Sequence, residues 1–417
     1  MLSAFELIAV LLVLTASFGW INHRFLGLPD TVGLLAMGLA ASLVLLLVEI
    51  SFPETPLYQE ITDFVRQVDF RKAVLDGVLA FLLFAGALHV NIGALRDRAW
   101  VVGGMATVGV LLSTALVGFG FYYISALLAA PIPLSWALVF GALISPTDPV
   151  AVLSTLKAVR VPQSLEMDMT GESLFNDGVG VVIFTIALAV AAGSGGEGGT
   201  GPGHIAELFV VEALGGAALG LAAGFIAYRA MKKIDNYSVE VLISLGLVTG
   251  AYALASRIGT SGPIAVVVAG LLIGNRGPKN AMSDLTQRYL FGFWTLADEI
   301  LNAILFLLIG LEVLVLRFDA GYAWTAAAAI PLVLAARLVS VAVPVLVLSR
   351  WNHFVDGTIP VLTWGGLRGG ISVALALSIP EVDAKSEILA ATYTVVVFTI
   401  LVQGLSLRRL VARTVSS

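Results

Sequence analysis

The sequence contains no cysteine, and only 12% of its residues are charged. Without cysteine, the protein has no disulfide bonds, no thiolate metal sites and no cysteine nucleophile. A soluble domain carries about 25% charged residues, so the shortage of charge argues against a chain that folds in water. No stretch combines basic and aromatic residues as nucleic-acid-binding surfaces do, so no nucleic-acid partner is expected.

Hydrophobic residues make up 59% of the 417-residue chain, and the mean hydropathy is +0.98. These values are typical of an all-α polytopic membrane protein. The first apolar run is not preceded by Lys or Arg and contains Glu6, so we interpret it as a retained span rather than a signal peptide. Apolar stretches of bilayer length predict about thirteen transmembrane helices, near residues 4–20, 31–50, 73–90, 101–125, 134–157, 164–192, 205–231, 237–256, 261–275, 290–316, 322–349, 358–379 and 387–411.

The connecting loops alternate in their content of basic residues. With this number of spans, every second loop faces the same side, and one such set holds most of the 23 Lys and Arg residues. This set comprises Arg24, Arg96, Arg98, Lys157, Arg160, Arg229, Lys232, Lys233, Arg276, Lys279, Arg288, Arg350, Arg408, Arg409 and Arg413. Because cytoplasmic loops carry an excess of positive charge, the N-terminus is predicted to lie outside and the C-terminus in the cytoplasm.

Two of the predicted spans are interrupted near their middles. The fifth contains Ser145-Pro146-Thr147-Asp148-Pro149, in which two prolines remove amide donors and break the helix. The twelfth contains Gly365-Gly366-Leu367-Arg368-Gly369-Gly370. Non-helical backbone at membrane depth is tolerated only where it is buried in protein or lines a cavity. The two spans hold the middle places of helices 4–6 and 11–13, which predicts inverted repeats with two crossed discontinuous helices around a transport site.

The sixth predicted span carries acidic and polar side chains at membrane depth, in Gly171-Glu172-Ser173-Leu174-Phe175-Asn176-Asp177-Gly178. An ionisable group at this depth is costly and needs a partner or a function. Ser173 and Asp177 are four residues apart, as are Glu172 and Asn176, so they group on adjoining faces of one helix. Carboxylate and hydroxyl oxygens suit a hard cation or a proton. The structural alternative is a pair of acids neutralised by buried partners.

Two arginines also lie within predicted spans, where a guanidinium remains charged. Glu172 is the natural partner of Arg337, which leaves Asp177 without a fixed counter-charge. Arg368 is placed to neutralise the negative ends of the half-helices, and Asp148 the positive ends.

The interruption of the fifth span supplies further candidate ligands for a cation. Thr147 offers a hydroxyl and a freed backbone carbonyl. Asp148 is a second candidate, because its carboxylate can contact the substrate as well as balance a helix end.

Together these motifs resemble the monovalent cation:proton antiporters of the NhaP/NHE type. The resemblance covers nearly the whole chain, and the order of the blocks makes it specific. It rests on Phe81-Leu82-Leu83-Phe84-Ala85-Gly86-Ala87-Leu88, Ser145-Pro146-Thr147-Asp148-Pro149, Gly171-Glu172-Ser173-Leu174-Phe175-Asn176-Asp177-Gly178, Leu305-Phe306-Leu307-Leu308-Ile309-Gly310-Leu311-Glu312, Arg337, and Trp364-Gly365-Gly366-Leu367-Arg368-Gly369-Gly370.

The resemblance implies a homodimer in which a dimerisation domain lies beside a mobile core. It assigns residues 1–100 to dimerisation helices 1–3 and residues 101–192 to core helices 4–6. Residues 193–236 form a linker and helix 7, and residues 237–318 form dimerisation helices 8–10. Residues 319–417 form core helices 11–13 and a short cytoplasmic tail.

The resemblance also implies roles for individual residues. Asp177 matches the aspartate that carries either cation or proton, and Asn176 before it resembles the electroneutral branch of the family. Ala85 stands where many members carry an acid on the third helix, so no accessory ligand is expected there. The predicted ion-binding residues are Asp177, Asp148, Ser173, Thr147, Glu172 and Asn176, of which Asp177, Asp148, Ser173 and Thr147 hold Na⁺; Arg337 and Arg368 are structural charge partners.

The expected function is exchange of Na⁺ or Li⁺ for H⁺, one for one, across a prokaryotic inner membrane. Cation and proton compete for Asp177, so one carboxylate cannot hold both, and no cofactor beyond the transported ions is expected. Three alternatives stay open on the sequence: K⁺/H⁺ exchange by the same fold, a channel or sensor, and an intramembrane aspartyl protease using Asp148 and Asp177. The protease class carries a Gly-x-Gly-Asp block that is missing here, so we expect a transporter rather than an enzyme.

Overall fold

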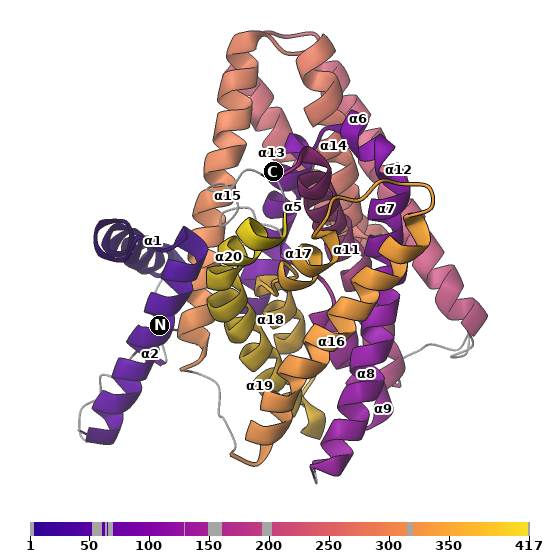
Figure 1. Cartoon of the computed structure of the whole chain (residues 1–417). Helices are drawn as coiled ribbons and strands as arrows, with labels where there is room; N and C mark the ends of the chain where they lie inside the picture. The colour runs from indigo at the N-terminus through magenta and orange to yellow at the C-terminus, as the bar shows by residue number, and fades with distance from the viewer. Residues whose placement is uncertain are drawn as a thin grey trace.

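The computed structural model describes residues 4–51, 61–62, 65, 70–128, 130–148, 161–193, 202–314 and 320–415. Parts of three predictions lie outside these residues: the second half of the fifth span (149–157), most of the linker (194–201), and the end of the tenth span (315–316). Within the described residues every regular element is helical, and Figure 1 shows how they are arranged.

The helices follow one another in this order: α1 (Ala4–Ile21), η1 (Asn22–Leu26), α2 (Asp30–Ser51), α4 (Phe70–Lys72), η2 (Ala73–Val78), α5 (Leu79–His89), α6 (Ile92–Asp97), α7 (Ala99–Gly104), η3 (Met105–Gly109), α8 (Val110–Leu127), α9 (Leu134–Ile144), α11 (Gln163–Ala191), α12 (Pro202–Met231), α13 (Tyr237–Ile258), α14 (Gly262–Asn280), α15 (Asp284–Glu312), η4 (Ala320–Tyr322), α16 (Ala323–Leu348), α17 (Thr358–Trp364), α18 (Gly370–Leu377), α19 (Asp383–Phe398), η5 (Thr399–Gln403) and α20 (Gly404–Thr414). The all-helical fold class predicted from composition is therefore confirmed for the described chain.

Ten of the described helical segments are long and apolar enough to cross a bilayer, judged by length and composition. They correspond to ten of the predicted spans. The remaining predicted spans coincide with α9, α14 and the α17–α18 pair, each too short, too interrupted or too polar for that measure. The number of actual membrane crossings stays a prediction.

Local sequence explains where several of these helices begin and end. Asn236 caps α13, because its side-chain oxygen accepts hydrogen bonds from the backbone N–H groups of Ser238 and Val239. Gly259 ends the same helix in the left-handed conformation, with φ of 70°, which glycine adopts without a steric penalty. Ser283 caps α15 in the same way as Asn236 caps α13. These caps give α13 and α15 defined starts.

The two predicted interruptions differ in how much of each is described. α9 ends at Ile144, and residues 146–148 that follow are not helical. α17 ends at Trp364 and α18 begins at Gly370, so the glycine-rich segment between them is unwound. The break in the twelfth span is therefore confirmed in full, and the break in the fifth is confirmed on its N-terminal side.

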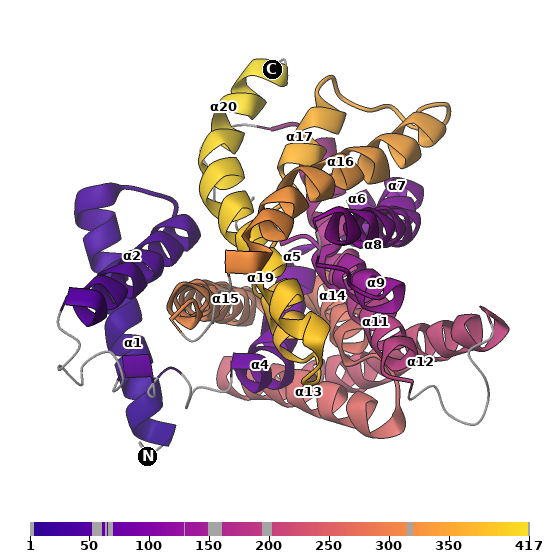
Figure 2. The same cartoon turned by 90° about the horizontal axis from the view of Figure 1, so that it is seen from below.

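The helices form two packed groups with α11 and α15 touching both. One hydrophobic core is shared by α8, α9, α16, α18 and α19, together with parts of α2, α11 and α15. A second core is formed by α5, α12, α13 and α14, with contributions from α11 and α15. α1 and α2 lie to one side of the molecule, with α15 between them and the other helices (Figures 1 and 2). α11 is thus held between the two groups.

Close packing of α12 on α14 depends on glycines spaced four residues apart. A Cβ added at Gly220 would lie 2.9 Å from the backbone carbon of Ala265 and would clash with its carbonyl oxygen. Gly216 and Gly224 face Ser261 and Ala269 in the same way. Small residues at this spacing let two helix backbones approach in a membrane. This contact fixes α12 against the second core.

A matched pair of alanine substitutions tests this packing. Gly220→Ala is expected to destabilise the protein by about 1–3 kcal/mol, because backbone rather than a flexible side chain must move. Gly246→Ala is expected to be neutral or stabilising, since nothing lies within 4 Å of a Cβ there and alanine favours the helix by about 1 kcal/mol. Thermal unfolding in detergent measures both, and equal effects would contradict the packing argument.

Candidate functional site

The two unwound segments contact each other directly. The backbone N–H of Asp148 donates to the carbonyl of Leu367 at 2.8 Å. The Arg368 guanidinium donates to the carbonyl oxygens of Ser145 and, at 2.8 Å, Pro146. These carbonyls lie in the segment just after the C-terminal end of α9, where the chain is no longer helical. Arg368 therefore neutralises the negative end of a half-helix, as the sequence predicted.

Thr147 is held in place by two side chains of α11. Its backbone N–H donates to Asn176 Oδ1 at 3.3 Å, and Asn176 Nδ2 donates to the Thr147 hydroxyl at 2.8 Å. The hydroxyls of Thr147 and Ser173 lie 3.1 Å apart. Asn176 thus fixes the backbone N–H and the hydroxyl of Thr147. A contact between Asn176 and an ion stays a prediction.

Two glycines make room where the segments meet α11 and each other. A Cβ at Gly369 would lie 2.8 Å from Cβ of Asp148. A Cβ at Gly180 would clash with the ring of Pro146. Glycine at these positions therefore permits the close approach that places residues 146–148 beside α11.

Asp177 differs from the other buried acids of α11, Asp168 and Glu172, in having no direct partner among the described residues. It is 5% exposed, and within the described residues it makes no hydrogen bond or ion pair. The Arg368 charge acts on it through space, as do the negative charges of Asp148 and Glu172. A buried carboxylate in this position gains free energy by binding a cation or a proton.

Glu172 is paired with the arginine that the sequence indicated. Arg337 Nη2 donates to Glu172 Oε2 at 2.8 Å, and Nη1 donates to Oε1 in a two-pronged contact. Arg337 also donates to the carbonyl of Leu362, from Nε at 3.2 Å and Nη2 at 3.1 Å. One arginine therefore compensates a buried acid and caps the C-terminal part of α17.

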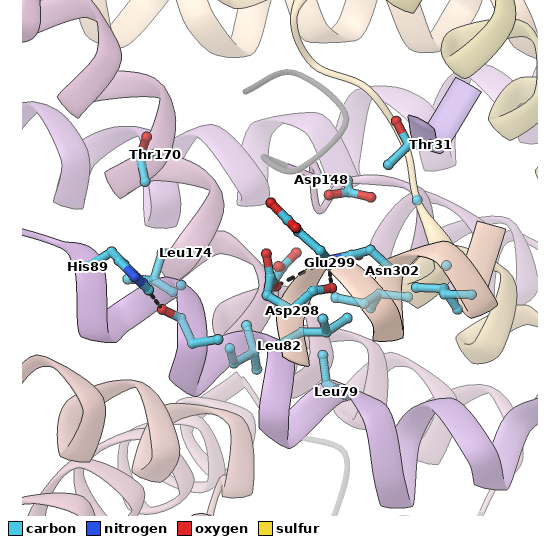
Figure 3. A pocket seen from close by; sticks show the side chains of 18 of the residues that line it. Thr31, Leu79, Leu82, His89, Asp148, Thr170, Leu174, Asp298, Glu299 and Asn302 are labelled. Carbon is cyan, nitrogen blue, oxygen red and sulfur yellow. Dashed lines mark hydrogen bonds between the residues drawn. The ribbon is translucent and has the colours of Figure 1, made fainter. Parts of the chain in front are cut away.

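A cavity of about 650 Å³ reaches this region, lined by the start of α2, by α5, by the N-terminal half of α11 and by the middle of α15. Asp148 and Asp177 line it together with Thr147. Figure 3 shows Asp148 on one wall and Asp298 and Glu299 of α15 pointing into the same space. Among its described lining residues none is Lys or Arg. An acidic cavity of this kind attracts cations.

The structure brings together the predicted residues of the fifth, sixth and twelfth spans, and it adds two features that the sequence analysis did not single out. Asp298 and Glu299 contribute acids from α15 to the cavity. Asp168 of α11 forms an ion pair with Arg98. Its place one helical turn before Glu172 was a signal in the sequence that could have drawn attention to it.

Comparison with known proteins places the chain in a family. The family described as "Sodium/hydrogen exchanger, transmembrane" matches residues 12–413. Na(+)/H(+) antiporter NhaP of Pseudomonas aeruginosa is 46% identical over 413 residues, covering 98% of this chain and 96% of that protein. Na(+)/H(+) antiporter NhaH of Halobacillus dabanensis is 35% identical, covering 97% of each.

A solved structure gives the same answer for the fold. The sodium proton antiporter MjNhaP1 from Methanocaldococcus jannaschii superposes with a TM-score of 0.77 at 19% identity, covering 99% of both chains. The antiporter fold that the resemblance of the motifs implied is confirmed by this likeness.

Crossed unwound helices around a buried carboxylate define a polytopic secondary transporter. The chain belongs to the sodium/hydrogen exchanger family. This is a family of transporters, so the intramembrane protease interpretation of Asp148 and Asp177 is not favoured.

The dual contact of Arg337 predicts a large effect of its removal. Arg337→Ala leaves Glu172 charged and unpaired and exposes the Leu362 carbonyl, which is expected to cost about 3–5 kcal/mol. Arg350→Ala is a matched control, because Arg350 is exposed just after the end of α16 and should change stability by less than about 0.5 kcal/mol. Thermal unfolding in detergent compares the two, and similar losses would argue against a special role of Arg337.

Proposed function

We propose that the protein exchanges Na⁺ for H⁺ across the membrane, one for one, with both ions competing for Asp177. The observation that carries this proposal is the difference between neighbouring acids on α11. Glu172 is neutralised by Arg337, whereas Asp177 is buried, lines the cavity and has no ion pair in the described structure. Relatives named as Na(+)/H(+) antiporters support the choice of ions.

Competition at one carboxylate explains why transport of the two ions is coupled. Asp177 with either Na⁺ or H⁺ bound is neutral overall, whereas the bare carboxylate is a costly buried charge. The protein therefore changes conformation with one ion or the other bound, but not with an empty site. Thr147, Ser173 and Asp148 supply the remaining oxygen ligands for Na⁺. No cofactor is needed.

The moving part is the core domain made of helices 4–6 and 11–13, in residues 101–192 and 319–417. It works against the dimerisation-domain helices in residues 1–100 and 237–318, within a homodimer in the cell membrane. The contact between the two interruptions supports treating both helix triplets as one body. With the N-terminus outside and the C-terminus in the cytoplasm, the cavity opens inward, because Asp30, Asn91 and Gln163 at its mouth lie at predicted cytoplasmic helix ends.

Asp177→Asn is expected to abolish exchange, because an amide can neither bind a proton nor balance a cation. Purified protein in liposomes with an internal pH dye measures Na⁺-driven proton movement. Asp284→Asn is a control, since Asp284 is exposed in the first turn of α15, and it should keep full activity. Full activity of Asp177→Asn would remove the basis of the proposed mechanism.

One-for-one exchange of Na⁺ and H⁺ moves no net charge. Proton movement in the same liposomes is therefore expected to be independent of an imposed membrane potential. A series of Na⁺, Li⁺ and K⁺ in this assay distinguishes Na⁺ exchange from K⁺ exchange by the same fold. Rates that follow the potential would contradict the one-for-one stoichiometry.

A further inference from the structure

Arg98, at the junction of α6 and α7, makes four contacts with other parts of the chain. Its Nε donates to Asp168 Oδ1 at 2.8 Å, and its Nη2 donates to Oδ2. Its Nη1 donates to the backbone carbonyl of His353 at 2.8 Å. The guanidinium carbon lies 4.8 Å from the centre of the Phe354 ring. Arg98 therefore joins the start of α7, the helix α11 and the loop between α16 and α17, which lie near one another in Figures 1 and 2.

The Arg98–Asp168 pair repeats the arrangement of the Arg337–Glu172 pair, and Asp168 lies one turn before Glu172 on α11. In both cases an acid of α11 forms a bidentate ion pair with an arginine. The same arginine also donates to a backbone carbonyl in the segment 353–362. Two-pronged pairs fix geometry as well as charge. The Glu172–Arg337 pair thus joins α11 to α16, and Arg98 joins α11 to the loop between α16 and α17.

Asp168 depends on Arg98 for its charge compensation. Its side chain is 1% exposed, while that of Arg98 is 12% exposed. The charged groups that act on Asp168 in the described structure are Arg98 and Glu172, and Glu172 repels it. Arg337 of α16, which contacts the next acid along α11, already donates hydrogen bonds to Glu172 and to the carbonyl of Leu362. Without Arg98, Asp168 must either take up a proton or draw Arg337 away from Glu172.

We propose that Arg98 is a positioning residue for ion exchange: it holds Asp168 as a permanently paired carboxylate, so that Asp177 is the only buried acid of α11 that exchanges ions. This inference rests on the proposed function at Asp177. Of the three buried acids of α11, Asp168 and Glu172 are thus each held by a bidentate arginine, and Asp177 is the one that binds Na⁺ or H⁺. Arg98 contacts neither ion.

The test compares Arg98→Gln, Asp168→Asn, the double variant and Arg98→Lys in the liposome assay, over about pH 6 to 9. Arg98→Gln is expected to lower the exchange rate about tenfold or more, because a buried pair is broken, and to change the shape of the pH profile. The double variant is expected to recover most of the rate and the wild-type profile, since no uncompensated carboxylate remains. Arg98→Lys should keep the profile, because the point charge is retained.

A second readout does not depend on exchange activity. In Arg98→Gln, an ionised Asp168 is costly in the folded protein, so the folded state favours its protonated form. The thermal stability of Arg98→Gln should therefore fall relative to the double variant as the pH rises. Wild type and the double variant should show parallel pH dependence in the same detergent.

The outcomes separate this inference from the proposed function. If the double variant has the same rate and pH profile as Arg98→Gln, Arg98 acts through packing alone and the inference fails, while exchange at Asp177 stands. If Asp177→Asn is active, the proposed function fails, and the stability measurement still decides whether Arg98 compensates Asp168. A pH profile of Arg98→Gln identical to wild type would also overturn the inference.

Discussion

At membrane depth, an unpaired charge or an unsatisfied backbone group is costly, and the centre of this protein is arranged around that constraint. Breaking two helices frees backbone carbonyls in the buried centre of the protein. Arg368 satisfies those of Ser145 and Pro146, and Arg337 satisfies that of Leu362. The segment after α9 and the C-terminal turn of α17 are therefore each tolerated because an arginine from another part of the chain compensates them.

The same constraint gives Asp177 its distinct role. Each arginine at the centre lowers the free-energy cost of burying the acid or carbonyl that it contacts. An arginine engaged in this way is not available to pair with another buried acid. Glu172 and Asp168 have arginine partners, and the unwound segments have theirs. Asp177 lies beside the crossing without a direct partner in the described residues, so it remains available to an ion from the cavity. The distribution of the positive charges thus leaves Asp177 as the one buried acid of α11 without a direct partner in the described residues.

Much of this architecture was predictable from local sequence. Apolar runs located the membrane helices, since bilayer thickness sets their length. The prolines beside Thr147 and the glycines around Arg368 located the interruptions, because these residues cannot continue a regular helix. The pairing of Glu172 with Arg337 followed from the cost of leaving a guanidinium unpaired. The structure shows the Asn176 amide bound to Thr147, and its contact with an ion stays a prediction.

What the sequence by itself determined is the set of helices, their two breaks and the presence of charges that need partners, because these follow from chain chemistry over a few residues. Only the tertiary structure decided which charge meets which. Arg98 and Asp168 are 70 residues apart, and Arg337 and Glu172 are 165 apart. Likewise, Asp298 joins the cavity only because α15 packs against α5 and α2. Such contacts depend on how helices cross in space, which no local pattern specifies.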